Sequence, residues 1–305
     1  MLLNKVLETV EWSTAGEIMD KVRQLGHMLT KAHSHELAIG NVVRRVLYII
    51  REEYMSALKT ESETKSPLLD APKNSGPPSS SSRGNNYQSR SLGTILTPGT
   101  DTDLSIPITD LKLSVNEGIA ELIDEIDSLH VNIADQAMEY IHADEVILTF
   151  GQSTSVEEFL KTAAKKRQFK VVVVESAPTL NGQHMAHSLS QHGIDVTVIP
   201  DSASGLQNIA LAAKKYSVPV VCVAGLIKLC PLYAHDLDVL NELIAPSNIY
   251  NYEDTVENLE VLNPAYDYVP PEFVSLYITN TGAHQPSYIY RLLAEYYSPQ
   301  DYQLA

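Results

Sequence analysis

The chain has 305 residues, of which 44% are hydrophobic and 20% are charged, and its formal net charge is −16 at pH 7. These values are typical of a globular protein with a full core and enough length for two domains. The acidic balance argues against a direct nucleic-acid partner, because phosphate contacts require clustered Lys and Arg side chains.

The first part of the chain is predicted to form two amphipathic helices. Apolar residues at steps of three and four indicate a helix over about 18–29, and a second helix follows over about 36–58. Arg44 and Arg45 belong to the polar side of the second helix. We expect the two helices to pack against each other.

Residues 60–107 differ in composition from both flanks. Pro, Gly and Ser dominate, and Gly76-Pro77-Pro78 is followed by four consecutive serines. Such a stretch buries too little apolar surface to offset the entropy lost on folding. We predict a disordered insertion within the helical domain.

The longest predicted helix runs from about 110 to 141. Its apolar residues follow a near-heptad pattern: Leu111, Val115, Ile119, Leu122, Ile126, Leu129 and Ile133. A stripe of this kind packs either against the first two helices or against a partner chain. We favour the core interpretation, in which residues 1–143 form one helical domain.

The second half of the chain is predicted to be a Rossmann-like domain over 144–305. Runs rich in β-branched residues at 145–150, 170–175 and 194–199 are typical of strands buried on both faces, as in a parallel sheet. The segments between them are long enough for crossover helices. Ser155 opens the capping-box sequence S-V-E-E and is predicted to start the first of these helices.

The later elements continue this alternation. In order, we expect a helix, a strand, a loop-rich stretch and a fifth strand, over 205–216, 218–224, 225–270 and 275–279. A turn then leads to a last helix that begins at Pro286, since the first helical turn accepts proline. The predicted fold class is therefore α/β, with an all-helical N-terminal domain before a Rossmann-like parallel sheet.

Chemistry in an open α/β sheet is expected at the carboxyl ends of its strands. Glu175 and Asp201 stand there and are candidates for a general acid and base, although carboxylates at strand ends also cap the next helix. The capping interpretation is the one we favour. Gly151 and the helix that follows it are a further candidate, for holding an anion through backbone N–H groups.

No cofactor or metal site is predicted. The sequence has neither G-x-G-x-x-G nor the phosphate-loop motif, and His184 and His187 lack a ligand partner at metal spacing. Cys222 and Cys230 do not have disulfide or C-x-x-C spacing, which favours a reducing compartment and a cytosolic protein. No apolar run approaches the roughly 20 residues of a membrane span, so no membrane partner is expected.

Several motifs spread along the chain resemble a known family. They include WSTAGE at 12–17, GNVVRRV at 40–46, IHADEVI at 141–147, ESAP at 175–178, NPAYDYVPP at 263–271 and PSYIYRLL at 286–293. These motifs are similar to the regulatory alpha, beta and delta subunits of eukaryotic translation initiation factor 2B, and NVVRR and DYVPP are of the beta type. The resemblance covers nearly the whole chain except 60–107.

The resemblance implies a helical domain followed by a Rossmann-like domain in a regulatory, non-catalytic subunit. In this family the alpha, beta and delta subunits form a core that senses phosphorylation of the alpha subunit of initiation factor 2, while gamma and epsilon carry guanine nucleotide exchange. The implied partners are thus the alpha, gamma, delta and epsilon subunits, and factor 2 through its alpha subunit.

The same resemblance implies which residues meet partners. The helical domain, near Arg44 and Arg45, would help to present a groove to the factor 2 alpha subunit. The Rossmann-like domain would pair with the delta subunit, with Glu158, His184, Asn280 and His284 as its partner-binding residues.

A sugar-phosphate binding protein or aldose–ketose isomerase of the same superfamily is the alternative. Its catalytic Cys would fall at Gly151, and its phosphate-binding Arg residues near Ala177 and His184. These positions hold neither Cys nor Arg, so the residues that an isomerase needs are not present there. The chain also departs from the family that it resembles, because the segment that the resemblance implies after Ala203 is missing. That segment contains one central strand, and its loss is expected to leave a gap in the sheet.

Overall fold

The computed structural model describes residues 5, 9, 11–33, 36–64, 104–108, 110–201, 205–232, 241, 243–251, 259–264 and 266–304. The chain divides into two compact units. The helical unit comprises Met1–Ala32, Ile39–Ile123 and Tyr290–Ala305, and the sheet unit comprises His33–Ala38 and Asp124–Ile289. The predicted insertion over 60–107 is wrong at its start, because residues 60–64 continue a helix that ends at Thr64, and residues 65–103 lie outside the described residues.

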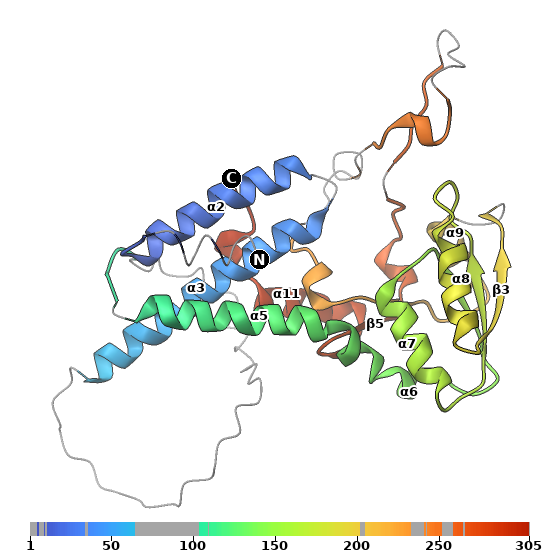
Figure 1. Ribbon diagram of the computed structural model, residues 1–305, viewed down its shortest axis with the longest axis horizontal. Coiled ribbons are helices and arrows are strands. Elements are labelled where there is room, and N and C mark those ends of the chain that lie inside the picture. Colours follow the sequence, from blue (N-terminus) through green and yellow to red (C-terminus); the bar gives the residue numbers. More distant parts are fainter. Residues whose placement is uncertain are drawn as a thin grey trace, which may run out of the picture. The chain divides into compact units, whose positions relative to one another are not determined.

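The helical unit is built from three long helices and one short helix, and their buried residues form an apolar core (Figure 1). They are α2 (Ala15–Ala32), α3 (Leu37–Thr64), the first part of α5 (Leu111–Ala134) and most of α11 (Ile289–Tyr296). A Cβ on Gly26 of α2 would lie 2.6 Å from a methyl of Val43, and one on Gly118 of α5 would lie 2.8 Å from a methyl of Ile49. Both helices therefore approach α3 closely at a glycine.

The core interpretation of the long apolar stripe is confirmed. Six of its seven residues are buried: Leu111, Val115, Ile119, Leu122, Leu129 and Ile133. The predicted single helix over 110–141 is wrong in one respect, because α5 ends at Ala134 and α6 runs over Ala137–Tyr140. At the break the N–H of Gln136 bonds three residues back to Ile133, and its side chain donates to the carbonyl of Thr279 at 2.7 Å.

Within the described residues, the sheet unit contains two separate three-stranded sheets. Sheet A has the order β1-β2-β3, all parallel, with β1 at Val146–Phe150, β2 at Lys170–Val174 and β3 at Asp195–Ile199. The crossover helices α7 (Thr154–Ala164) and α8 (Asn181–Gln191) contact each other (Figure 1). The three predicted strands and both crossovers are confirmed, but the predicted burial of the strands on both faces is wrong for β1 and β3, and only β2 is largely buried.

The predicted start of α7 is wrong by two residues. Its N-cap is Ser153, whose side chain accepts a hydrogen bond from the N–H of Val156. Ser155 is buried instead, and its hydroxyl lies 3.1 Å from Nδ1 of His130. Tertiary contact with the α5 helix therefore overrides the capping-box pattern.

Sheet B contains the later strands. It has the order β4-β5-β6, with β4 at Val221–Val223, β5 at Leu276–Thr279 and β6 at Gly282–His284. β4 and β5 are parallel, whereas β5 and β6 form an antiparallel hairpin that the sequence analysis did not predict. Helix α9 occupies Leu206–Lys215. Short 3-10 turns complete the chain: η2 (Leu226–Lys228), η3 (Pro246–Asn248), η5 (Pro271–Phe273), η6 (Pro286–Tyr288) and η7 (Pro299–Asp301).

The grouping of the chain differs from the predicted boundary at 143/144. The residues from Tyr290 onwards belong to the helical unit, and the sheet unit begins at Asp124 within α5. The α/β fold class, with helices before a Rossmann-like parallel sheet, is confirmed. Among the helices of the described residues, none is both long and apolar enough to span a membrane.

Candidate interaction surfaces

A buried carboxylate ties the C-terminal segment to the helical unit. Asp301 has no exposed surface, and its Oδ1 accepts a hydrogen bond from Nη2 of Arg23 at 2.9 Å. Arg51 of α3 donates to both Asp301 oxygens, at 3.1 and 3.2 Å. A buried charge needs such partners, since an unpaired carboxylate in an apolar interior is very unfavourable.

Arg44 and Arg45 also hold the C-terminal segment. Arg44 is only 5% exposed, and its Nε donates to the carbonyl of Tyr302 at 3.0 Å. Arg45 donates to the carbonyl of Tyr296 at 3.0 Å, and its guanidinium lies 4.1 Å from the centre of that ring. The structure thus places these two predicted partner residues in internal contacts. Their part in binding factor 2 stays a prediction.

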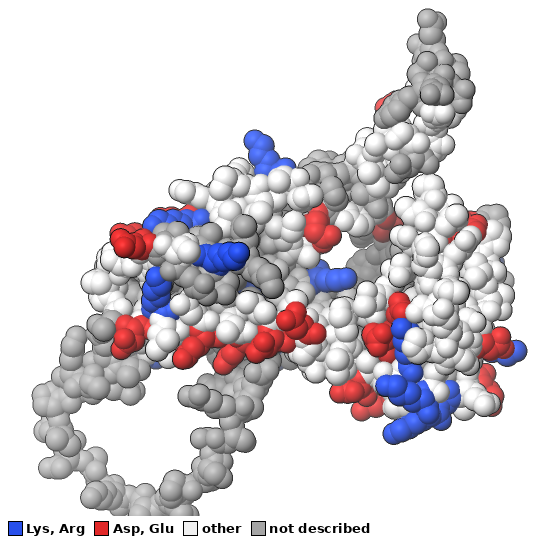
Figure 2. All heavy atoms as spheres, viewed as in Figure 1, with Lys and Arg blue, Asp and Glu red and all other residues white. Residues whose placement is uncertain are grey.

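Acidic side chains gather along α5 (Figure 2). Burial raises the pKa of Glu53 on α3, and the neighbouring carboxylates of Glu52, Glu121 and Glu117 raise it further. Like charges therefore face each other between α3 and α5. This face of the helical unit is suited to a basic partner surface rather than an acidic one.

On the sheet unit, Glu158 and His184 lie on the two crossover helices. Glu157 of α7 accepts a hydrogen bond from Lys161 of the same helix at 2.6 Å. It also accepts one from the Ser188 hydroxyl of α8, and this second bond joins the two helices. The Glu158 carboxylate lies 3.3 Å from Nζ of Lys161, with its side chain about half exposed, and His184 is exposed on α8. Both are accessible to a partner in the described part of the chain.

Asn280 and His284 lie on the β5–β6 hairpin. Asn280 accepts a hydrogen bond from the N–H of Leu226 at 2.9 Å and donates to Glu125 at 2.9 Å, which joins the hairpin to α5. His284 stacks on Tyr288 with ring centres 5.4 Å apart, and burial lowers its pKa. Burial therefore disfavours the charged form of His284. Partner binding by these four sheet-unit residues also stays a prediction.

Of the two carboxylates at the carboxyl end of sheet A, Glu175 accepts a hydrogen bond from Nε2 of Gln183 at 3.4 Å, and Asp201 binds the backbone. Asp201 accepts hydrogen bonds from the backbone N–H groups of Ser176, at 3.0 Å, and Ala177. Both of its oxygens are thereby used to close the loop after β2. Gly151 has φ +63, a backbone conformation in which residues with a side chain are strained. In the ranges that the structure describes, no three His, Cys, Asp or Glu side chains come together as metal ligands.

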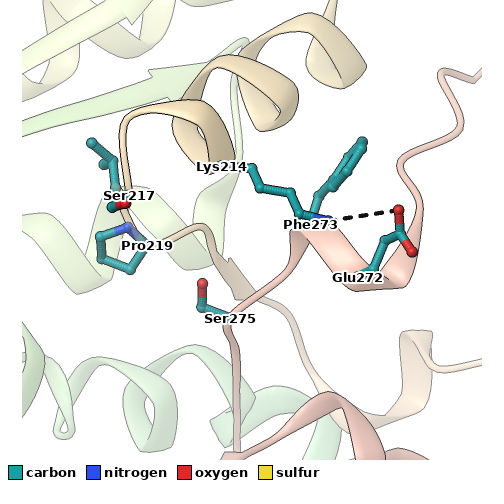
Figure 3. Close-up of a pocket in the computed structure, with 7 residues that line it drawn as sticks. Lys214, Ser217, Pro219, Glu272, Phe273 and Ser275 are labelled. Carbon is teal, nitrogen blue, oxygen red and sulfur yellow. Dashed lines mark ion pairs between the residues drawn. The ribbon is translucent and has the colours of Figure 1, made fainter.

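A shallow cavity of about 290 Å³ lies between α9 and η5 (Figure 3). Lys214 lies on one side of it, 3.7 Å from the Glu272 carboxylate and 4.7 Å from the centre of the Phe273 ring. Because Glu272 balances the ammonium charge, the cavity offers no net charge to a phosphate. Sequence reasoning missed it, since its two sides come from segments far apart along the chain.

Comparison with known proteins decides the family. The model of the initiation factor 2 subunit family matches residues 1–207 and again 202–286. The chain belongs to this family. A curated relative from Dictyostelium discoideum, translation initiation factor eIF2B subunit beta, is 40% identical over an alignment that covers 98% of this chain and 89% of the relative. This match confirms the predicted resemblance and its beta type, and it identifies a subunit of the factor rather than an isomerase.

Two solved structures share the fold of this chain. The crystal structure of eIF2B beta from Chaetomium thermophilum has a TM-score of 0.66 at 24% identity, and it covers 98% of this chain and 85% of that chain. A chain of the tetrameric eIF2B beta2-delta2 complex from the same organism has a TM-score of 0.65 at 23% identity, with 97% and 86% covered. At these identities the likeness supports the fold alone.

Proposed function

We propose that this chain is a regulatory, non-catalytic subunit of eIF2B, the guanine nucleotide exchange factor for initiation factor 2. The observation that supports this proposal most directly is the 40% identity to an eIF2B beta subunit over nearly the whole chain. In this proposal the chain assembles in the cytosol with the alpha, gamma, delta and epsilon subunits. It helps the complex to bind factor 2 and to sense its alpha subunit.

Assembly through the sheet unit is supported by two observations. The related fold from Chaetomium thermophilum was solved as a complex of beta with delta. The sheet unit also exposes large apolar side chains along and after α9: Leu206, Leu211, Tyr216 and Val218. A stable partner would bury a total of roughly 1,600 Å² or more. We place Glu158 and His184 at the polar rim of the delta-subunit contact.

Recognition of the factor 2 alpha subunit is proposed for the helical unit. Arg44 and Arg45 act there as positioning residues, because their polar atoms bind the C-terminal segment. The acidic face of α5 supplies exposed charge for a basic partner surface. Loss of the C-terminal segment would then weaken recognition indirectly.

Co-expression with the delta subunit tests assembly. We expect the two chains to co-elute in size-exclusion chromatography at micromolar concentration, and Glu158→Lys with His184→Glu to reduce co-elution. Lys165→Glu with Lys166→Glu is the matched control, since both lysines are exposed at the end of the same helix α7. Separate elution of the wild-type chains would contradict the proposal.

Two further measurements test the sensing of the factor 2 alpha subunit and the non-catalytic assignment. The assembled complex should bind the factor 2 alpha subunit with an affinity that changes on its phosphorylation, as measured by surface plasmon resonance. Equal affinity for both forms would contradict sensing. Calorimetry with ribose phosphates should show no binding, and submillimolar affinity would contradict the non-catalytic assignment and favour the isomerase alternative.

A further inference from the structure

The cavity between α9 and η5 lies at the amino ends of two parallel strands. Val218 and Pro219 line it just before β4, and Ser275 lines it just before β5. The N–H of Val220 donates to the Ser275 hydroxyl oxygen at 3.2 Å, and the N–H of Ser275 donates to the carbonyl of Val220 at 2.8 Å. These two bonds hold the segments that lead into β4 and β5 side by side.

The side chains around the cavity are of mixed chemistry (Figure 3). Ser217 and Pro219 lie on one side, and Lys214 and Phe273 lie on the other. The Ser275 hydroxyl points into the space between them (Figure 3). The Phe273 ring is half-buried, and the Lys214 ammonium lies 4.7 Å from its centre. The lining therefore combines aliphatic surface, an aromatic ring and two hydroxyl groups.

The charges at the cavity favour a neutral ligand. Nζ of Lys214 lies 3.7 Å from the Glu272 carboxylate, and both side chains are more than half exposed. Such a pair contributes little to stability, but it leaves the cavity without net charge. A phosphate or a carboxylate would have to compete with Glu272 for the ammonium group. We therefore expect a ligand with an apolar body and an uncharged polar end.

The two hydroxyl groups indicate what that polar end is. Ser275 Oγ accepts the bond from Val220, so its own proton can be donated to a ligand. Ser217 is exposed, and its hydroxyl has no hydrogen-bond partner among the described residues. A phenol group both donates and accepts a hydrogen bond, so it suits both serines. Tyrosine joins that group to a ring that can stack on Phe273.

The size and the shallow shape of the cavity favour a protein side chain over a free small molecule. Its volume of about 290 Å³ is at the lower limit, about 300 Å³, of pockets that bury most of a small ligand. A free ligand in a shallow cavity stays largely in water. Next to the cavity, Tyr216 and Val218 are 73% and 56% exposed. A protein surface would cover both of these side chains in the same contact, as occurs around the anchor residue of an interface.

We propose that this cavity receives one tyrosine side chain of the delta subunit. The ring packs against Phe273, Val218 and Pro219, and the phenol hydroxyl bonds to Ser217 and Ser275. Val218 belongs both to the cavity and to the apolar surface after α9 that we assign to assembly, so the occupant comes from the subunit that covers that surface. The inference rests on the proposed assembly with the delta subunit and names its anchoring contact.

Affinity for the delta subunit tests the anchor. Val218→Asp places a charge in the cavity and should weaken binding to the full chain by at least about tenfold in surface plasmon resonance. Val146→Asp is the matched control, because Val146 is 67% exposed on β1 and does not line the cavity. The control should change the affinity by less than about twofold. Ser217→Trp, which fills the cavity from an exposed position, replaces Val218→Asp if the latter lowers the melting temperature.

Photo-cross-linking identifies the occupant. With p-benzoylphenylalanine at position 218, the full chain should cross-link to the delta subunit, and mass spectrometry should map the product to a segment that contains a tyrosine. Replacement of that tyrosine by leucine should weaken binding by at least about tenfold. A second probe needs no partner: p-cresol, the tyrosine side chain as a free molecule, should give a saturation-transfer NMR signal with the wild-type chain that Val218→Asp abolishes.

Several results would overturn the inference. Equal affinity of wild type and Val218→Asp for the delta subunit would do so while leaving the proposed assembly intact. So would cross-linking only to another subunit, to a second copy or to a segment without tyrosine, and so would a p-cresol signal that Val218→Asp leaves unchanged. Separate elution of the wild-type chains would instead contradict the proposed assembly, and with it the named occupant.

Discussion

The two units of this chain differ in how many large apolar side chains they leave exposed, and the described part of the sheet unit exposes more of them. The helical unit fully buries large residues such as Met19, Leu47 and Tyr54, and it also buries a paired carboxylate, Asp301. The sheet unit leaves apolar residues exposed on its strands and on α9. The helical unit is thus closed by its own C-terminal segment, whereas the sheet unit exposes surface that a partner would cover.

The largest expected effect tests whether the buried ion pairs of Asp301 hold the C-terminal segment on the helical unit. Asp301→Ala should lower its free energy of unfolding by about 3 kcal/mol, because Arg23 and Arg51 would lose a buried partner. Fluorescence of Trp12, the single tryptophan, during denaturation by urea measures this change. Asp20→Ala is the control, since Asp20 is an exposed partner of the same Arg23 and should matter by less than about 0.5 kcal/mol. Equal effects would show that burial of Asp301 is unimportant.

A smaller effect is expected in the sheet unit from Gly182→Ala. A Cβ there would lie 2.0 Å from the carbonyl oxygen of Val174, a backbone atom of β2. The shift of α8 away from β2 should cost about 2 kcal/mol, measured by hydrogen exchange of the β2 amides. Ser190→Ala, at an exposed site on the same helix, should leave that exchange unchanged. Unchanged exchange in Gly182→Ala would contradict the close packing.

Removal of repulsion should stabilise the helical unit. The folded pKa of Glu53 is raised by burial and by nearby carboxylates above its ordinary value of 4.5. Stability from this group is therefore present below pH 4.5 and is lost as pH rises through the folded pKa. Glu53→Gln should raise the melting temperature near pH 7 and lose this advantage near pH 4. A gain that is equal at both pH values would contradict the electrostatic cause.

The smallest expected effect concerns the β5–β6 hairpin. Burial lowers the folded pKa of His284 below its ordinary value of 6.5, so stability is present above pH 6.5 and is lost as pH falls through the folded pKa. Between about pH 7.5 and pH 5.5, wild type should lose more stability than His284→Gln in urea denaturation. The exposed His187→Gln on α8 serves as the control and should behave like wild type. Equal pH dependence in wild type and His284→Gln would contradict the prediction.

Much of the fold could be predicted from patterns within single segments. The β-branched runs identified β1, β2 and β3 to within a residue, because β-branched residues favour extended backbone, although only β2 is largely buried. The start of α7 could not be predicted, since Ser155 bonds to His130 on a distant helix. The β6 strand was missed because it has only three residues and depends on pairing with β5.

The candidate surfaces were harder to predict than the fold. Arg44 and Arg45 have the sequence of a polar helix face, yet they bind carbonyls more than 250 residues later in the chain. Asn280 similarly bonds to Glu125 and to the loop after β4. Glu158 and His184 lie at accessible positions on α7 and α8, because helix periodicity determines which residues point away from a sheet, and partner binding by both stays a prediction.

The amino-acid sequence alone determined the order of helices and strands, the α/β class and the family resemblance, because each depends on local periodicity and motif. Only the tertiary structure decided that the C-terminal segment completes the helical unit and that β4, β5 and β6 form a second sheet. The physical reason is that ion pairs and strand ladders join residues far apart in sequence, so no local pattern specifies which partner each group meets.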